Sequence, residues 1–405
     1  MNSNGSPDSG MSGIFSDRIS DVPRSFIREI LKVTLDRTVI SFAGGLPNRD
    51  LFPVEELKEA AVKVMETYGS DIFQYGNSEG HPGLREMISH RYREKRNLDI
   101  PVEDILITNG AQQGLDLLGK IYVNEGDPMI IEEPGYLGAI QAFSIFRPEF
   151  HPVPVSDEGM DIDKLRSVMS CRRPKLIYTV PNFQNPSGIS YSEENRRQIT
   201  GILEGTPTLL IEDDPYVDLR YSGESLLSFK TYLPDNAILL GSFSKTVVPG
   251  FRLGWIAARG DIMDKLIIAK QASDLHTNQF VQYVIYRYLQ DNDIDLHITK
   301  IKKAYGEQLR TMAECIDEYF PSGTSRTHPR GGMFIWAELP EGLSARNLLD
   351  RTIQEKVIFV PGDPFYVNRR DANTMRLNFS CTGKEVIRDG IARLGKAIEI
   401  VLNDI

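Results

Sequence analysis

Cysteine is scarce in this sequence. Only Cys171, Cys315 and Cys381 occur among the 405 residues, far apart and without Cys-x-x-Cys spacing. Neither a disulfide framework nor a zinc cluster is therefore indicated. Scarce, unpaired cysteine is typical of a reduced compartment, so we expect a cytoplasmic protein with no metal site.

Long apolar runs and an excess of basic residues are also lacking. No run approaches the ~18 apolar residues of a membrane span, and the polar residues 1–20 match no secretory signal. Lysine and arginine total 46 against 56 acidic residues, a formal net charge of −10, which gives no basis for a nucleic-acid surface. We therefore expect neither a membrane nor DNA or RNA as a partner.

Strand-like and helix-like segments alternate through much of the chain. Short β-rich runs are expected at Ile105–Thr108, Met129–Glu133, Lys175–Val180, Thr208–Glu212, Ala237–Gly241 and Leu253–Ala258. Helical segments separate most of these runs, which indicates crossover connections and a mostly parallel sheet with helices on both faces. In such sheets, ligands bind at the carboxyl ends of the strands.

The alternation stops after the last of these strands. Asp261–Gln290 and Asp293–Phe320 are expected to be long helical stretches, and we place a domain boundary near residue 290. A chain of this length buries about 75% of its unfolded surface, which favours two domains. The expected division is a disordered tail at 1–13, an N-terminal segment at 14–48 that joins the small domain, a large domain at 49–290 and a small α+β domain at 291–405.

The segment Gly241–Gly254 follows an apolar run and gathers hydroxyls, a lysine and an arginine. Lys245, just past a buried strand, is poorly hydrated, which favours the neutral amine and suits it to imine formation with an aldehyde. Ser242 and Ser244 offer hydroxyls, and Arg252 offers a planar fork suited to a phosphate. An aldehyde-reactive amine beside a phosphate cradle indicates pyridoxal 5'-phosphate (PLP). An exposed lysine in a serine-rich loop is the alternative.

Other strand ends carry residue types that this cofactor needs. Gly110-Ala111-Gln112 begins a helix whose free N–H groups suit an anion, and Tyr136 offers a ring face for stacking. The respective alternatives are an ordinary strand-turn-helix that binds no anion and an ordinary core tyrosine. Glu212-Asp213-Asp214 ends an apolar strand, where a buried acid would keep the pyridine nitrogen protonated. Asn185 and Tyr216 are placed to reach the 3'-oxygen.

Two further features suit a substrate. Ile40–Pro47 is expected to be a strand that runs into a turn at Gly44-Gly45, where the backbone can approach a ligand closely. Arg376 places a charge on a β-rich segment, as a bidentate clamp for a carboxylate requires. An ordinary turn and an edge-strand arginine that faces water are the respective alternatives.

Together these motifs resemble the fold-type I, PLP-dependent aminotransferases of class I/II, from about Ser25 to the C-terminus. The resemblance rests on Ser-Phe-Ser-Lys-Thr at 242–246, Pro-Gly-Phe-Arg-Leu-Gly at 249–254, Asn-Pro-Ser-Gly at 185–188 and Glu-Asp-Asp-Pro-Tyr at 212–216. Residues 26–33 and 41–47 are similar to the subgroup of 2-aminoadipate and kynurenine aminotransferases, which has broad substrate tolerance. The resemblance implies an α/β fold with a mostly parallel seven-stranded sheet flanked by helices, a smaller α+β domain and a homodimer with shared active sites.

The resemblance also implies a role for each residue of the set. Lys245 would hold PLP covalently and move the proton between Cα and C4', while Asp213, and not Asp214, would pair with the pyridinium nitrogen. Asn185 and Tyr216 would bind the 3'-oxygen. The other implied contacts are ring stacking by Tyr136, phosphate binding by Ala111, Gln112, Ser242, Ser244 and Arg252, phosphate binding in the neighbouring subunit by Tyr75, and substrate binding by Arg376, Asn185, Gly45 and Arg28. Arg376 would clamp the α-carboxylate and Arg28 the distal group, with Arg24 as the rival.

The sequence departs from the family in two respects. Ala111 replaces a serine often found there, so one phosphate contact is expected from the backbone alone. Relatives that regulate transcription carry a winged helix before this domain, and the residues that precede it here are too few for one.

The expected activity is ping-pong transfer of an amino group between an amino acid and a 2-oxo acid. Glutamate and 2-oxoglutarate are the expected common pair, with 2-aminoadipate, aromatic or branched aliphatic amino acids as the other donors. A PLP-dependent carbon–sulfur lyase on the same scaffold is the alternative enzyme. A ligand-sensing module that binds PLP without turnover is the third hypothesis.

Overall fold

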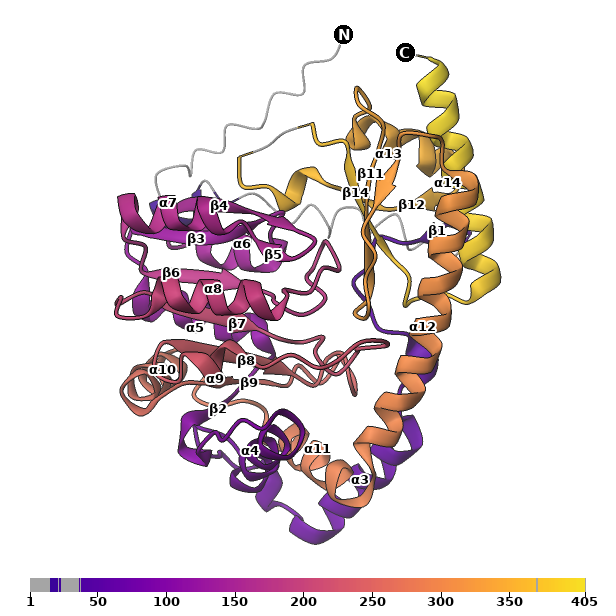
Figure 1. Cartoon of the computed structure of the whole chain (residues 1–405). Helices are drawn as coiled ribbons and strands as arrows, with labels where there is room; N and C mark the ends of the chain where they lie inside the picture. The colour runs from indigo at the N-terminus through magenta and orange to yellow at the C-terminus, as the bar shows by residue number, and fades with distance from the viewer. Residues whose placement is uncertain (1–14, 21, 23–35, 37, 369–370, 405) are drawn as a thin grey trace.

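The structure is a computed structural model that describes residues 15–20, 22, 36, 38–368 and 371–404. A large sheet and a smaller domain lie side by side, and the long helix α12 (Ile294–Tyr319) runs from α3 and α11 at one end to α14 at the other (Figure 1). The predicted tail at 1–13 and the candidate substrate-binding residues Arg24 and Arg28 lie outside the described residues.

The large sheet has eight strands in the order β2-β9-β8-β7-β6-β3-β4-β5. They are β2 (Ile105–Thr108), β3 (Pro128–Glu133), β4 (Glu149–Ser156), β5 (Gly159–Met160), β6 (Leu176–Thr179), β7 (Leu209–Asp213), β8 (Ala237–Ser242) and β9 (Gly254–Ala257). Strands β8, β7, β6, β3 and β4 pair in parallel, whereas β9 is antiparallel to both β2 and β8. The predicted α/β class with a mostly parallel sheet is confirmed.

The number of strands differs from the predicted seven. The two-residue strand β5 pairs antiparallel with β4 and is the additional strand. No range was predicted for β4 either, because Pro152 and Pro154 interrupt its strand pattern and proline cannot donate to a sheet ladder. Both strands lie at one end of the sheet, where proline is tolerated.

Alternate residues of the central strands pack on opposite faces of the sheet. Met129 and Ile131 belong to a core with α5 (Ala111–Tyr122), α6 (Leu137–Ser144) and α10 (Gly260–Ser273). Ile130 points the other way, into a core with α7 (Ile162–Arg172), α8 (Glu193–Leu203) and α9 (Phe229–Tyr232). On that second face, Ile107 packs with α3 (Val54–Tyr68), α4 (Pro82–Arg96) and α11 (Gln279–Asp291). Burial on both faces explains why these strands read as continuous apolar runs.

The predicted helical stretch Asp261–Gln290 is two helices, α10 and α11. The residues between them, Asp274–Asn278, contain neither glycine nor proline, so the pattern did not reveal the break. Leu275 adopts a left-handed φ of 67°, and the Asn278 side chain caps α11 by accepting from Val281 N at 3.0 Å.

The smaller domain is built on an antiparallel sheet of four strands in the order β10-β11-β14-β13. These are β10 (Ser325–Arg326), β11 (Phe334–Glu338), β14 (Thr374–Asn378) and β13 (Val360–Pro361), covered by α13 (Ala345–Gln354) and α14 (Lys384–Asn403). Strand β1 (Ile40–Ser41) pairs in parallel with β12 (Val357–Ile358), which supports our proposal that residues 14–48 belong with this domain. The remaining short elements are α1 (Asp17–Ser20), η1 (Arg49–Leu51), η2 (Asp71–Phe73), η3 (Val102–Asp104) and η4 (Asp363–Phe365).

None of the helices in the described part of the chain is long and apolar enough to cross a membrane.

Candidate active site

The carboxyl ends of the parallel strands open into a pocket of about 370 Å³, which the smaller domain closes on one side through Arg376. The predicted residues that line it are Gly45, Ala111, Gln112, Tyr136, Asn185, Asp213, Tyr216, Ser242, Ser244, Lys245, Arg252 and Arg376. Residues separated by more than three hundred positions in the chain therefore meet in one cavity, as the placement of polar residues at strand ends predicts.

Lys245 stands in the turn after β8, and its Nζ donates to the carbonyl oxygen of Gly45 at 2.9 Å. Burial lowers the pKa of its ammonium group to about 8, and the positive charges of Arg376 and Arg252 act in the same direction. Half of the Lys245 amines are therefore neutral near pH 8, whereas an exposed lysine is almost entirely charged there. A neutral, buried amine is the form that attacks an aldehyde.

Asp213 ends β7 and is only 3% exposed. Its Oδ2 accepts a hydrogen bond from the Tyr178 hydroxyl at 2.7 Å, whereas its Oδ1 has no partner among the described residues. Burial raises the pKa of this carboxyl to about 7, and the Tyr178 hydrogen bond opposes that shift. A buried oxygen without a donor is costly, and a protonated ring nitrogen in the pocket would supply the missing donor.

Arg376 lies on β14, between β11 and β13, and is 2% exposed, which excludes the alternative of an edge-strand arginine facing water. Its guanidinium donates to Asn185 Oδ1 at 2.8 Å and to the Ala43 carbonyl oxygen at 2.6 Å. Its Nε has no partner among the described residues. A buried guanidinium with a spare donor that lines a pocket can bind a carboxylate there.

The end of the pocket that suits a phosphate is formed by the start of α5 and the turn after β8. The Ser242 and Ser244 hydroxyls lie 2.9 Å apart, and the side chain of Arg252 approaches Gly110. Gly110 has a φ of 74°, and a Cβ there would come within 2.6 Å of Arg252 Nη2. Glycine is therefore required at the start of α5, where it leaves the helix N-terminus open to an anion.

The Gln112 side chain is already engaged, because its Nε2 donates to the Gly138 carbonyl oxygen at 2.8 Å. Ala111 has no polar side chain, so the first turn of α5 presents backbone N–H groups to the pocket. A phosphate contact at Ala111 through the backbone alone stays a prediction.

Tyr136 and Tyr216 complete the wall of the pocket. Burial raises the pKa of the Tyr136 hydroxyl to about 12 and raises that of Tyr216 as well. Both hydroxyls are therefore protonated at neutral pH and can donate hydrogen bonds. The Asn185–Pro186 peptide bond is cis.

These features fit PLP. Asp213 Oδ1, which has no partner among the described residues, lies in the same pocket as the N-terminus of α5, Arg252 and the two serines. The buried Lys245 amine, with its lowered pKa, lines that pocket too. The residues that would hold the ring nitrogen, the aldehyde and the phosphate are thus of the required types.

One predicted residue of the described part of the chain does not line this pocket. Tyr75 is 78% exposed, and its ring contacts His276 with a centroid separation of 5.8 Å. Arg28 lies outside the described residues.

Sequence reasoning missed several residues of the site. Leu46, Leu115, Val180, Pro215 and Pro249 line the pocket, and Tyr178 holds Asp213 from a neighbouring strand. Tyr178 pairs in register with Ile211, two positions before Asp213, so the pairing of β6 with β7 was the signal that could have found it.

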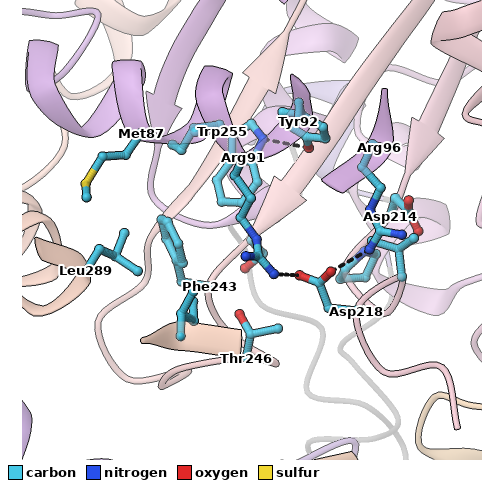
Figure 2. A pocket seen from close by; sticks show the side chains of 15 residues that line it. Met87, Arg91, Tyr92, Arg96, Asp214, Asp218, Phe243, Thr246, Trp255 and Leu289 are labelled. Atoms are coloured by element: carbon cyan, nitrogen blue, oxygen red, sulfur yellow. Dashed lines mark hydrogen bonds and ion pairs between the residues drawn. The ribbon is translucent and has the colours of Figure 1, made fainter. Parts of the chain in front are cut away.

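A smaller cavity of about 60 Å³ adjoins the turn that carries Lys245, since Phe243 and Thr246 line it (Figure 2). Figure 2 shows Arg91 and Arg96 converging on Asp218, and Arg91 Nη2 lies 3.1 Å from Asp218 Oδ2. These ion pairs tie α4 to the loop after β7, which also supplies Tyr216.

Comparison with known proteins identifies this arrangement. The sequence model of the family "Aminotransferase class I and II" matches residues 37–394. The chain belongs to the class I and II aminotransferases.

This aminotransferase is 40% identical to aromatic-amino-acid aminotransferase 1 of Thermococcus litoralis, over 95% of this chain and 94% of the relative. It is 36% identical to LysN, the alpha-aminoadipate aminotransferase of Thermus thermophilus. The two structures superpose with a TM-score of 0.91, over 97% of this chain and 99% of LysN. It is 38% identical to the Pyrococcus horikoshii kynurenine aminotransferase, with coverages of 97% and 99% and a TM-score of 0.92.

The aminotransferase is thus closely related to the aminoadipate, kynurenine and aromatic enzymes, and it depends on PLP. LysN was crystallised with N-(5'-phosphopyridoxyl)-L-leucine and the Pyrococcus enzyme with PMP, the amine form of the cofactor.

Proposed function

We propose that this aminotransferase moves an amino group between glutamate and a range of 2-oxo acids by a ping-pong mechanism. 2-Aminoadipate and aromatic or branched aliphatic amino acids are the proposed partners of the glutamate and 2-oxoglutarate pair. The observation that carries the proposal is one pocket that unites the buried Lys245 amine, the unpartnered Asp213 Oδ1 and the Arg376 guanidinium.

Bound PLP supplies an electron sink for the carbanion that forms when the substrate Cα loses its proton. Asp213 is proposed to keep the ring nitrogen protonated, and Asn185 and Tyr216 to bind the 3'-oxygen. Tyr136 is proposed to stack on the ring, and the first turn of α5, at Ala111 and Gln112, to bind the phosphate together with Ser242, Ser244 and Arg252.

Lys245 is proposed to move the proton between Cα and C4' once the substrate has displaced it from the cofactor. Its pKa of about 8 lies close to neutral pH, where a general base combines a useful neutral fraction with sufficient basicity.

Arg376 is proposed to bind the substrate α-carboxylate beside Asn185. Gly45 is proposed to lie against the substrate, since it has no side chain and lines the same pocket. Arg28 is proposed to bind the distal group of acidic substrates, with Arg24 as the rival. If Arg28→Ala raises KM equally for acidic and apolar donors, the proposal for Arg28 is wrong.

The range of proposed substrates is supported by the relatives. The proteins at 36–40% identity include enzymes named for aromatic amino acids and for alpha-aminoadipate, and the latter was crystallised with a leucine adduct. A pocket that serves acidic, aromatic and aliphatic side chains must recognise chiefly the α-carboxylate and α-amino groups. Binding of the α-carboxylate is the role proposed for Arg376.

A homodimer with shared active sites is proposed from the surface around Tyr75. Tyr68, Phe73, Tyr75, His276, Phe280 and Tyr283 form an aromatic patch with ring contacts among its members. Phe73 and Tyr75 are 70% and 78% exposed in the single chain, which is unusual for aromatic side chains and typical of an interface. We propose that a second copy of the chain covers this patch and receives Tyr75 at its phosphate site.

A cytoplasmic location is proposed from the three unpaired cysteines, of which Cys171 is exposed.

The test is a panel of amino donors, mixed one at a time with the PLP-loaded protein. Conversion of the cofactor to its amine form, followed by visible absorption, identifies each donor, and 2-oxoglutarate should reverse it. Glutamate and several donors of the proposed classes should convert the cofactor. No conversion with any of the twenty amino acids or 2-aminoadipate would contradict the proposal, and release of ammonia and pyruvate from a cysteine-type substrate without an acceptor would favour the lyase.

A further inference from the structure

Glu132 is a buried carboxylate next to the active site that none of the proposed roles uses. It stands near the end of β3, is 1% exposed and forms no ion pair within the described part of the chain. Four donors satisfy it instead. Its Oε1 accepts from Thr179 Oγ1 at 2.7 Å, Val180 N at 2.9 Å and Tyr191 Oη at 2.7 Å, and its Oε2 accepts from Gln184 Nε2 at 2.9 Å.

The four donors favour the ionised form of Glu132. The Val180 N–H and the Gln184 amide N–H can only donate, and a proton on the carboxyl group would compete with the donors for its lone pairs. Burial raises the pKa of Glu132, and the hydrogen bond from Gln184 is the largest influence that opposes this. Burial of a carboxylate whose partners are all neutral hydrogen-bond donors costs free energy, which suggests that Glu132 does more than pack in the core.

Gln184 is the residue through which Glu132 acts on the site. Its amide nitrogen donates to Glu132 Oε2 and to the Pro134 carbonyl oxygen at 2.6 Å, and its Oε1 accepts from Ser187 N at 2.8 Å. Glu132 therefore sets the direction of the amide, because an amide turned the other way would place its oxygen against the carboxylate.

Two loops of the active site are joined at this amide. Gln184 directly precedes Asn185, which contacts Arg376, and Pro134 is two residues before Tyr136. A shift of the Gln184 amide would consequently move Asn185, and with it the guanidinium that Asn185 orients.

We propose that Glu132 is a positioning residue for amino transfer, which acts through Gln184 to hold Asn185 at the cofactor and beside Arg376. The proposal rests on the role proposed for Asn185 in the site. It predicts that the carboxylate matters for catalysis although it touches neither the cofactor nor the substrate.

The test is a double-mutant cycle on the PLP-loaded enzyme, with Glu132→Gln, Asn185→Ala and the double variant. Glu132→Gln keeps the shape but presents an N–H group to one of the four donors. It should lower kcat/KM at least tenfold at saturating PLP, and the double variant should be no worse than Asn185→Ala alone. Additive losses, or a lower melting temperature with kcat/KM unchanged, would overturn the proposal.

A second pair of variants covers the case in which Glu132→Gln does not fold. Gln184→Ala removes the amide that connects Glu132 to Asn185, and it should lower kcat/KM as Asn185→Ala does. It should also move the pH midpoint of the visible cofactor absorption in the same direction as Asn185→Ala. The control Tyr191→Phe removes one donor from Glu132 and leaves Gln184 in place, so it should lower the melting temperature while kcat/KM stays within twofold of wild type. A midpoint that is unchanged in Gln184→Ala would overturn the proposal.

The absorption midpoint also separates this proposal from the function on which it rests. If the wild-type protein binds PLP but converts no donor, the proposed function fails. The shift shared by Gln184→Ala and Asn185→Ala can still be measured in that case, and it tests the positioning role alone.

Discussion

Arg376 of the smaller domain donates to Asn185 of the large domain at 2.8 Å, and both residues are almost fully buried. The proposed substrate clamp is thereby oriented by the residue proposed to bind the 3'-oxygen of the cofactor. Under these proposed roles, this hydrogen bond would couple substrate recognition to cofactor recognition.

Replacement of Arg376 by lysine should weaken substrate binding much more than it weakens cofactor binding. A lysine keeps the charge but loses the planar fork and cannot serve Asn185, Ala43 and a carboxylate together. Since hydrogen bonds to charged groups are worth about 1.5–3 kcal/mol, KM for glutamate should rise on the order of 10–100-fold. Steady-state kinetics checks this, with Arg326→Lys on strand β10 of the same sheet as the matched control. An equal loss in both variants would contradict the clamp.

Asp213 and Asp214 are adjacent acids that should behave differently on conversion to asparagine. Asp213 Oδ1 has no partner within the described part of the chain, whereas Asp214 Oδ1 accepts from the Asn182 side chain at 3.0 Å. Loss of a buried ion pair costs about 3–5 kcal/mol, so Asp213→Asn should lower kcat on the order of 10²–10⁴-fold. Asp214→Asn should lower kcat by less than tenfold. Single-turnover conversion of the bound cofactor by glutamate measures the difference, and equal losses would refute the assignment to Asp213.

The rate at which the cofactor-free protein captures PLP should follow the ionisation of Lys245. Burial lowers the pKa of Lys245 to about 8, and only the neutral amine attacks the aldehyde. The rate should therefore rise about tenfold per pH unit below this pKa and level off above it. Stopped-flow absorbance measures the rate, and methylamine with PLP provides the control, since an unperturbed amine levels off only near pH ~10.4. A rate for the protein that keeps rising to that pH would show that Lys245 is not shifted.

Much of this site was predictable because it follows directly from strands. The apolar runs that end at Asp213 and Ser242 are buried on both faces, so the polar residues after them had to lie at one edge of the sheet. Gly110-Ala111-Gln112 was predicted as a helix start that suits an anion, and Arg376 as a charge on a β-rich segment, whereas the positive φ of Gly110 and the burial of Arg376 are findings of the structure.

Other features depend on contacts that a linear pattern does not record. Tyr178 meets Asp213 only because β6 lies next to β7, and Glu132 meets Gln184 only through the pairing of β3 with β6. The antiparallel course of β9 follows from a turn that returns directly from β8 without a crossover helix, which the strand pattern of Leu253–Ala258 did not reveal. Strand β4 was hidden by its prolines.

Tyr75 should serve the active site of the neighbouring subunit. Its hydroxyl is proposed to bind the phosphate there, so Tyr75→Phe should raise the dissociation constant for PLP on the order of tenfold, as expected for the loss of one hydrogen bond to a charged group. Tyr68→Phe removes a hydroxyl from the same aromatic patch and should leave PLP binding unchanged. Equilibrium titration of the cofactor-free variants with PLP checks both.

The decisive form of this prediction uses subunit mixing. Lys245→Ala protein cannot hold PLP covalently, but it retains Tyr75. In a heterodimer with Tyr75→Phe, the subunit that has Lys245 would receive an intact Tyr75 from its partner, which restores one complete site. The two variants are mixed, dissociated and reassembled. At limiting PLP, the activity of this mixture should exceed the summed activities of the two variants measured separately. No gain on mixing, with heterodimers shown by native mass spectrometry, would mean that Tyr75 does not cross between subunits.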